Sequence, residues 1–139
     1  MRLQRLSVSL VGVVAAISLV TACANDATSP ARVQGIYRLN RVNGSNLPFL
    51  AESTDSSKLE ILGGAMVLDA SGTWSAEVTS RLTAGTGTTP ASQRANGTFS
   101  LDGDRVTFTG TDGENFSGLL SGDRVTAGYD GITFEFVKQ

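Results

Sequence analysis

The sequence predicts an all-β protein, an antiparallel up-and-down meander of about eight strands that closes into a small barrel. Two observations favour this fold class, and one physical argument favours its closure. From Gly35 onward, apolar and polar residues alternate with period two, and the spacing of a helix never persists for more than a turn. Glycine-containing turn signals separate the alternating runs at short intervals. Closure into a barrel removes the exposed edges that an open sheet would present.

The clearest predicted strand is 73–82, where Trp74, Ala76 and Val78 alternate with polar residues, so that one face is buried and the other meets water. In the preceding strand, apolar residues after the pair Gly63-Gly64 stand at both odd and even positions, so the period-two alternation is broken. This predicts a β-bulge or a sharp bend. The expected strands are 34–42, 58–69, 72–83, 95–102, 104–110, 114–120, 123–129 and 131–138.

Dense turn signals predict that consecutive strands pair as antiparallel neighbours. Asp-Gly between alternating runs favours a hairpin, because a type I′ turn needs positive φ at both central residues. A repeat supports the meander, since Gly103–Thr107 (GDRVT) recurs as Gly122–Thr126, two strands and two turns later. Two segments fall outside the pattern: Asn43–Ser57 is expected to be a long connection, and Ala84–Asn96, rich in Gly, Thr and Ser, a mobile loop.

Residue counts exclude several classes of function. The chain of 139 residues has no histidine and one cysteine, which excludes Ser-His-Asp and Cys-His catalysis, histidine-bearing zinc sites and an intrachain disulfide. The net charge is −2 and the basic residues are scattered, so the basic stripe of a nucleic-acid-binding protein is missing. Carboxylates gather beside glycines at hairpin tips; turn formation is their favoured role, with calcium binding and catalysis as alternatives. We therefore expect neither enzyme activity nor a metal or cofactor.

The amino terminus has the organisation of an export signal. Two arginines precede an apolar run at 6–20, which is shorter than the roughly 20 residues that a membrane-spanning helix needs. The tetrad Val20-Thr21-Ala22-Cys23 resembles the lipobox of bacterial lipoproteins. This resemblance implies that residues 1–22 are a signal peptide that is removed, and that 23–33 comprises a lipidated cysteine and a flexible tether.

The resemblance also implies a location. Residue 24 is alanine rather than aspartate, so the signal that retains enteric lipoproteins in the inner membrane is missing, and the outer membrane of a bacterial envelope is the expected destination. The alternative is an ordinary secreted protein in which Cys23 is a free thiol near the cleavage site. In either case residues 34–139 form the β-barrel domain.

The start of this domain carries a second resemblance. Gly35-Ile-Tyr-Arg-Leu39, followed by Val42-Asn-Gly44 and Leu47-Pro48, is similar to the opening of small bacterial lipocalin-like domains, where Gly-x-Trp or Gly-x-Tyr begins the first strand. The META-type envelope domains, which have a different fold, share a similar opening. The lipocalin-like resemblance implies a small barrel.

The inward aromatic residues either fill this barrel or line a cavity, because an eight-stranded barrel is just wide enough for side chains or for one small ligand. The leading hypothesis is a monomer that binds a small apolar ligand unchanged, since no histidine or buried acid is available to polarise a bond. This ligand enters beside Asn43–Ser57 and Ala84–Asn96. The alternative is a periplasmic inhibitor or scaffold whose two loops dock on a partner protein. The candidate ligand-binding residues are Tyr37, Phe49, Leu50, Trp74 and Phe134.

Overall fold

A computed structural model describes residues 27–139 and confirms the all-β class. The expected signal peptide and Cys23 lie outside the described residues. Helix within 27–139 is limited to a 3₁₀ turn, η1 (Pro30–Arg32), and no helix there is long and apolar enough to cross a membrane. The strands are β1 (Gly35–Val42), β2 (Ser45–Asn46), β3 (Phe49–Ser53), β4 (Ser57–Leu68), β5 (Thr73–Ala84), β6 (Gly87–Asp102), β7 (Arg105–Gly110), β8 (Asn115–Ser121), β9 (Arg124–Tyr129) and β10 (Ile132–Lys138).

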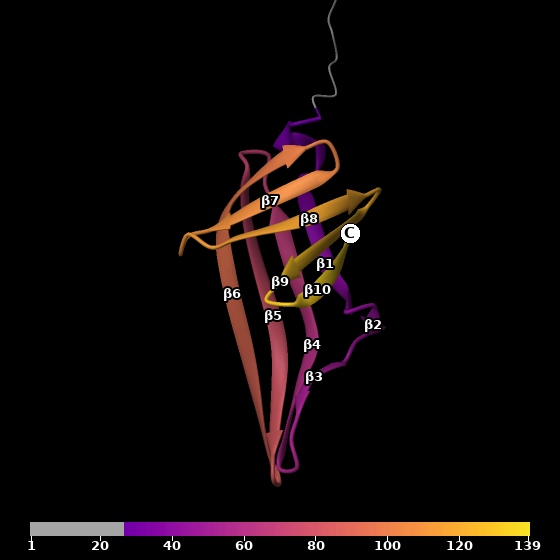
Figure 1. Ribbon diagram of the computed structural model, residues 1–139, viewed down its shortest axis with the longest axis vertical. Helices are drawn as coiled ribbons and strands as arrows, with labels where there is room; N and C mark the ends of the chain where they lie inside the picture. Colours follow the sequence, from indigo (N-terminus) through magenta and orange to yellow (C-terminus); the bar gives the residue numbers. More distant parts are fainter. Residues whose placement is uncertain (1–26) are drawn as a thin grey trace, which may run out of the picture.

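The strands form one antiparallel sheet that closes on itself (Figure 1). Each strand from β3 to β10 pairs with the next, and β1 pairs with β10 on one side and with β4 on the other. β1 and β4–β10 are therefore the eight strands of a closed meander, while β2 and β3 belong to the connection between β1 and β4. The predicted barrel is confirmed.

Three strands, β4, β5 and β6, are longer than the part of them that belongs to the barrel. β4 and β5 have 12 residues each and β6 has 16. β1 pairs with the part of β4 from Ala65 to Leu68, and β7 pairs with the part of β6 from Gly97 to Asp102. Beyond these pairings the four strands β3–β6 continue as a sheet that projects from the barrel, at the lower end of Figure 1. This part, residues 49–53, 57–64, 78–84 and 87–96, is called the extension below.

The prediction of a mobile loop at Ala84–Asn96 is wrong, because most of this segment is the first part of β6. It pairs with β5 in an unbroken register from Thr73–Thr98 to Ala84–Gly87. Threonine favours strands, and the small residues, which suggest a loop by composition, are accommodated in a strand once a long partner strand supplies the backbone hydrogen bonds. The Asn43–Ser57 connection also contains structure, namely β2 and β3.

Several local predictions are confirmed. The pairing of β4 with β5 shifts register between Ile61 and Gly63, immediately before the Gly63-Gly64 pair at which the sequence predicts a bulge or bend. The two copies of the GDRVT repeat occupy equivalent hairpins, with Gly103 and Gly122 at φ of 61° and 60°. In these hairpins the central pair is Gly-Asp, so only the first central residue has positive φ, in contrast to the type I′ geometry expected.

Side chains fill much of the barrel. Val42, Val106, Phe108 and Val125 are fully buried. The Trp74 ring meets the rings of Phe108 and Phe116 edge-on, at centroid distances of 5.5 and 5.4 Å. These contacts anchor β5, β7 and β8 to one another, because each aromatic pair adds about 0.5–1.5 kcal/mol beyond the area that it buries.

The segment before β1 packs against the barrel. Val33 is buried, and its carbonyl accepts a hydrogen bond of 2.6 Å from the buried Tyr37 hydroxyl. Arg32 donates a hydrogen bond to the Gly103 carbonyl and lies 3.9 Å from the Asp104 carboxylate. Residues 30–33, which the sequence assigns to the tether, therefore contact the folded domain.

Candidate ligand-binding cleft

An apolar cleft of about 520 Å³ is lined by the inner face of the extension, by barrel residues of β4, β5, β8, β9 and β10, and by the turn between β7 and β8. Its floor follows from the period-two geometry of strands. β5 contributes every second residue from Trp74 to Leu82, and β6 contributes Ala91, Gln93 and Ala95. Larger side chains, including Met66 and Phe134, form the walls.

Small side chains keep this cleft open. Ala76 lies opposite Ala95 in the β5–β6 register, and Ala91 lies opposite Ser80. Ala127 adds a further small side chain from β9. The interior is therefore divided: large side chains fill the core of the barrel, and an unfilled apolar surface remains where the extension joins it.

The outer face of the extension and of the adjoining part of β5 is charged, and two ion pairs join neighbouring strands there. Arg81 lies 2.8 Å from the Glu60 carboxylate, and Arg94 lies 3.2 Å from the Glu77 carboxylate. The hydrogen bond from Arg81 lowers the pKa of Glu60, and hydrogen bonds from Ser92 and then Arg94 lower the pKa of Glu77. These arginines are neutralised by partners on the side of the sheet that faces away from the cleft.

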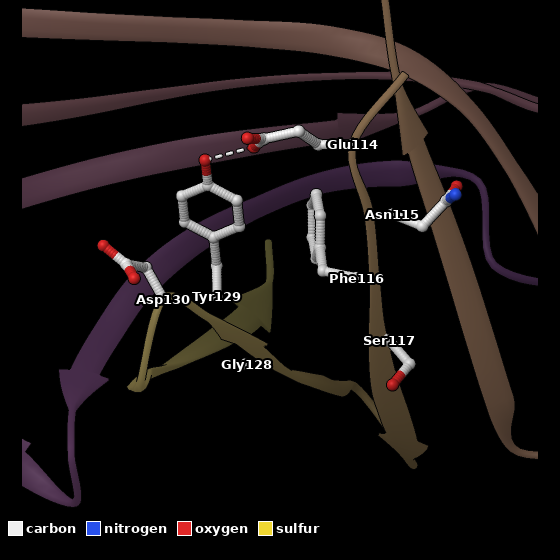
Figure 2. Close-up of a pocket in the computed structure, with 7 residues that line it drawn as sticks. All are labelled: Glu114, Asn115, Phe116, Ser117, Gly128, Tyr129 and Asp130. Carbon is white, nitrogen blue, oxygen red and sulfur yellow. Dashed lines mark hydrogen bonds between the residues drawn. The ribbon is translucent and has the colours of Figure 1, made fainter. Parts of the chain in front are cut away.

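A second and more open depression, of about 610 Å³, adjoins the cleft where β8 and β9 separate (Figure 2). The two strands pair from Gly118–Ala127 to Ser121–Arg124, and the segments 115–117 and 128–130 lie beyond these pairs. We call this gap the seam. Four residues line both the seam and the cleft: Glu114, Phe116, Tyr129 and Asp130.

Tyr129 crosses the seam. Figure 2 shows its hydroxyl directed at the Glu114 carboxylate, to which it donates a hydrogen bond. Its ring meets the Phe116 ring edge-on, with centroids 5.6 Å apart. The hydrogen bond to Glu114 and that residue's charge, with smaller contributions from Asp112 and Asp130, raise the pKa of Tyr129. One protonated phenol and three carboxylates thus line the same edge of the cleft.

The structure brings together two of the five predicted ligand-binding residues. Trp74 and Phe134 both line the cleft. Tyr37 is 3% exposed and is bonded to Val33, outside the lining. Phe49 is half-buried and packs against the core, while Leu50 alternates with it onto the outer face of β3 and is 52% exposed.

Comparisons with known proteins give no assignment. No protein-family model, curated protein or solved structure matches the chain. The cleft combines aliphatic and aromatic surface with hydrogen-bonding groups on Ser80, Gln93 and Tyr129, a composition that many sites for small organic molecules share. Among residues 27–139 no group of three or more acidic or cysteine side chains is arranged to hold a metal ion.

Sequence reasoning missed the β6 side of the cleft and the acidic edge. Ala91, Gln93 and Ala95 alternate with Ser92 and Arg94, a period-two signal that the loop-like composition of the segment concealed. In the sequence the carboxylates of Asp112, Glu114 and Asp130 stand beside turn glycines, and their shared position at the cleft depends on where β8 and β9 separate. No short sequence pattern predicts the point at which β8 and β9 stop pairing.

Proposed function

We propose that this protein is a non-enzymatic, lipid-anchored protein of the bacterial envelope that binds a small apolar ligand in the cleft. The observation that carries the proposal is the cleft itself. Its volume of about 520 Å³ lies in the usual range for sites of small organic ligands, and its lining is chiefly aliphatic and aromatic. The closed eight-stranded barrel and the lipocalin-like opening of β1 support the same class of function.

The ligand is carried or sequestered without chemical change. The chain has no histidine, and Asp112, Glu114 and Asp130 are exposed to water, so none is a buried general acid. Tyr129 is engaged as a hydrogen-bond donor to Glu114. The groups that face the cleft therefore bind and orient, and none is poised to polarise a bond.

The proposed location rests on the amino-terminal sequence. The lipobox-like tetrad ending at Cys23 supports acylation of that residue, and alanine at position 24 supports the outer membrane. Several acyl chains on one residue anchor a protein stably, because each buried CH₂ contributes about 0.8 kcal/mol. The barrel then acts as a monomer in the periplasm, tethered through the segment that precedes η1.

Fluorescence provides a direct test, because Trp74 is the chain's one tryptophan and it lines the cleft. We expect the full-length protein to bind Nile red, a neutral apolar dye, saturably and with a shift of Trp74 emission as water leaves its surroundings. Ala95→Phe fills the cleft from an exposed position on β6 and is expected to weaken binding at least about tenfold, or about 1.4 kcal/mol. Asn96→Phe, on the opposite face of the same strand, is the matched control.

Two results would contradict the proposal. One is the absence of saturable binding of Nile red and of a second neutral probe, farnesol. The other is an equal effect of Ala95→Phe and Asn96→Phe, which would place the dye outside the cleft.

A protein partner is the second candidate, and the edge of β6 is the observation that favours it. Residues 87–96 pair with β5 on one side and have no strand on the other among residues 27–139, and open edges accept strands from partners. Pro90 and Arg94 lie on this edge, however, and proline and charge are typical of edges that resist pairing. Recovery of one stoichiometric envelope protein with the full chain, together with failure of Nile red to bind, would favour this inhibitor or scaffold function.

A further inference from the structure

The cleft has a marked asymmetry of charge. Its apolar floor lies along the extension, and carboxylates occur where it meets the barrel, on Asp112, Glu114 and Asp130. Among the described residues that line it, none is lysine or arginine. The cleft is thus apolar along one part and acidic at the other.

These three carboxylates are not neutralised within the described chain. None of the ion pairs formed among residues 27–139 involves them, whereas Glu60, Glu77 and Glu135 each have an arginine within 3.5 Å. Glu114 accepts a hydrogen bond from the Tyr129 hydroxyl, and Asp112 accepts one of 3.1 Å from the Glu114 backbone amide. Both donors are uncharged, so the negative charge of the site persists.

Aromatic rings adjoin the same end of the cleft. Trp74 contacts Phe116 at a centroid distance of 5.4 Å, and Phe116 contacts Tyr129 at 5.6 Å. The faces of such rings attract ammonium groups through the ring quadrupole, most strongly where the cation loses water. Carboxylates and rings at one end, with aliphatic side chains along the rest, are complementary to a molecule that has a cationic head and an apolar tail.

We infer that the ligand of the cleft is a small cationic amphiphile, with its alkyl or prenyl tail along the inner face of β5 and β6 and its ammonium head beside Asp112, Glu114 and Asp130. This inference rests on the proposed function and narrows its ligand class. The apolar lining of the cleft is complementary to an apolar tail, and the three carboxylates are complementary to a positively charged head group.

The test compares three probes of equal chain length: dodecyltrimethylammonium, dodecanol and dodecanoate. Each is titrated below its micelle concentration into the full-length protein, with Trp74 emission as the readout. Dodecyltrimethylammonium is expected to bind about tenfold more tightly than dodecanol, and dodecanoate more weakly than both. Raising the salt concentration should reduce the preference for the cation, because exposed charges are screened.

Variants of the cleft carboxylates test whether the preference for the cationic probe depends on them. Glu114→Gln combined with Asp130→Asn removes two charges and keeps polar groups in place; asparagine tolerates the φ of 49° at residue 130. The ratio of cation to alcohol affinity is expected to fall toward one in this double variant. Asp102→Asn, which removes an exposed turn carboxylate outside the cleft, should leave the ratio unchanged.

The outcomes separate the inference from the function on which it rests. Equal affinities for all three probes in the wild-type protein would overturn the cationic ligand and leave the apolar binding function intact. A preference for the cation that survives in the double variant, or that does not depend on salt, would also overturn it. If none of the three probes nor Nile red binds saturably, the proposed function and the inference both fail.

Discussion

Tyr129 at the end of β9 donates a hydrogen bond to Glu114, just before β8, across a seam where the two strands have ceased to pair. This contact joins the acidic edge of the cleft to the barrel wall. Phe116 packs against the same ring, so the phenol is held by one polar and one aromatic contact. The hydroxyl can donate only while it is protonated. Deprotonation of Tyr129 therefore removes the hydrogen bond that crosses the seam.

We expect the free energy of unfolding to decrease at alkaline pH. The hydrogen bond to Glu114 and the neighbouring carboxylates raise the pKa of Tyr129 above its ordinary value of 10.0. A group whose pKa is higher in the folded state contributes stability that is fully present below the unfolded pKa and lost as pH rises through the folded pKa. The decrease should therefore begin near pH 10. Denaturant unfolding over an alkaline pH series measures it, and Tyr129→Phe should make the decrease smaller.

The other tyrosine supplies the internal comparison. Burial, and secondarily the charge of Asp123, raise the pKa of Tyr37, so part of the alkaline decrease should remain in Tyr129→Phe. The chain has two tyrosines, so the phenolate absorbance of Tyr129→Phe reports Tyr37 alone, and its difference from the wild-type titration reports Tyr129. Glu114→Gln should lower the pKa of Tyr129 and leave that of Tyr37 in place. Titration of Tyr129 at or below pH 10.0 in the wild-type protein would contradict this account of the seam.

Trp74 is expected to be a major contributor to stability. It is 5% exposed and contacts Phe108 and Phe116, so Trp74→Ala should cost about 3–5 kcal/mol through lost burial and the cavity left behind. Leu50→Ala, at an exposed position on β3, should change stability by no more than about 0.5 kcal/mol. Urea unfolding measures both. A loss below about 1 kcal/mol for Trp74→Ala would mean that its side chain does not lie in the core.

The barrel could be predicted because its determinants are local. Alternation along each strand fixes which side chains point inward, and Trp74, Phe108 and Val125 are all buried as that alternation requires. Glycine-containing turns set the order of neighbours. The long β6 could not be predicted in the same way, because residues 87–96 become a strand through pairing with β5 rather than through their own apolar pattern.

The cleft was predictable only in part, for a related reason. Trp74 and Phe134 could be inferred from inward alternation. The space beside them depends on how far the extension projects past the barrel, and the acidic edge depends on the point where β8 and β9 separate. Both are properties of long-range pairing that no short sequence window contains.

The amino terminus gives a prediction about processing. In the lipobox-like context the mature protein should begin at Cys23, carry acyl groups there and sediment with membranes. Mass spectrometry of the membrane fraction measures the loss of residues 1–22 and the added mass. Cys23→Ser should release a soluble protein, and wild-type protein found in soluble form with a free thiol would contradict the anchor.

Gly97 lies where β6 leaves the barrel and enters the extension. It pairs with Trp74 on one side and with Gly110 on the other. A Cβ atom at this position would overlap the carbonyl oxygen of Thr109, which also accepts a hydrogen bond of 3.4 Å from the Trp74 indole. The absence of a side chain therefore permits the close approach of β7 to β6 beside the base of the cleft.

Gly97→Ala should destabilise the protein by about 1–3 kcal/mol, because the Thr109 carbonyl is backbone and must move with its strand. The same displacement should disturb the indole hydrogen bond and alter the emission of Trp74. Gly128→Ala is the matched control: it also lies within a strand, and a Cβ there would meet no atom within 4 Å, so its effect should stay within about 0.5 kcal/mol. Thermal and urea unfolding of the two variants measure the difference. Equal stability of the two would show that β6 and β7 are not in close contact at this point.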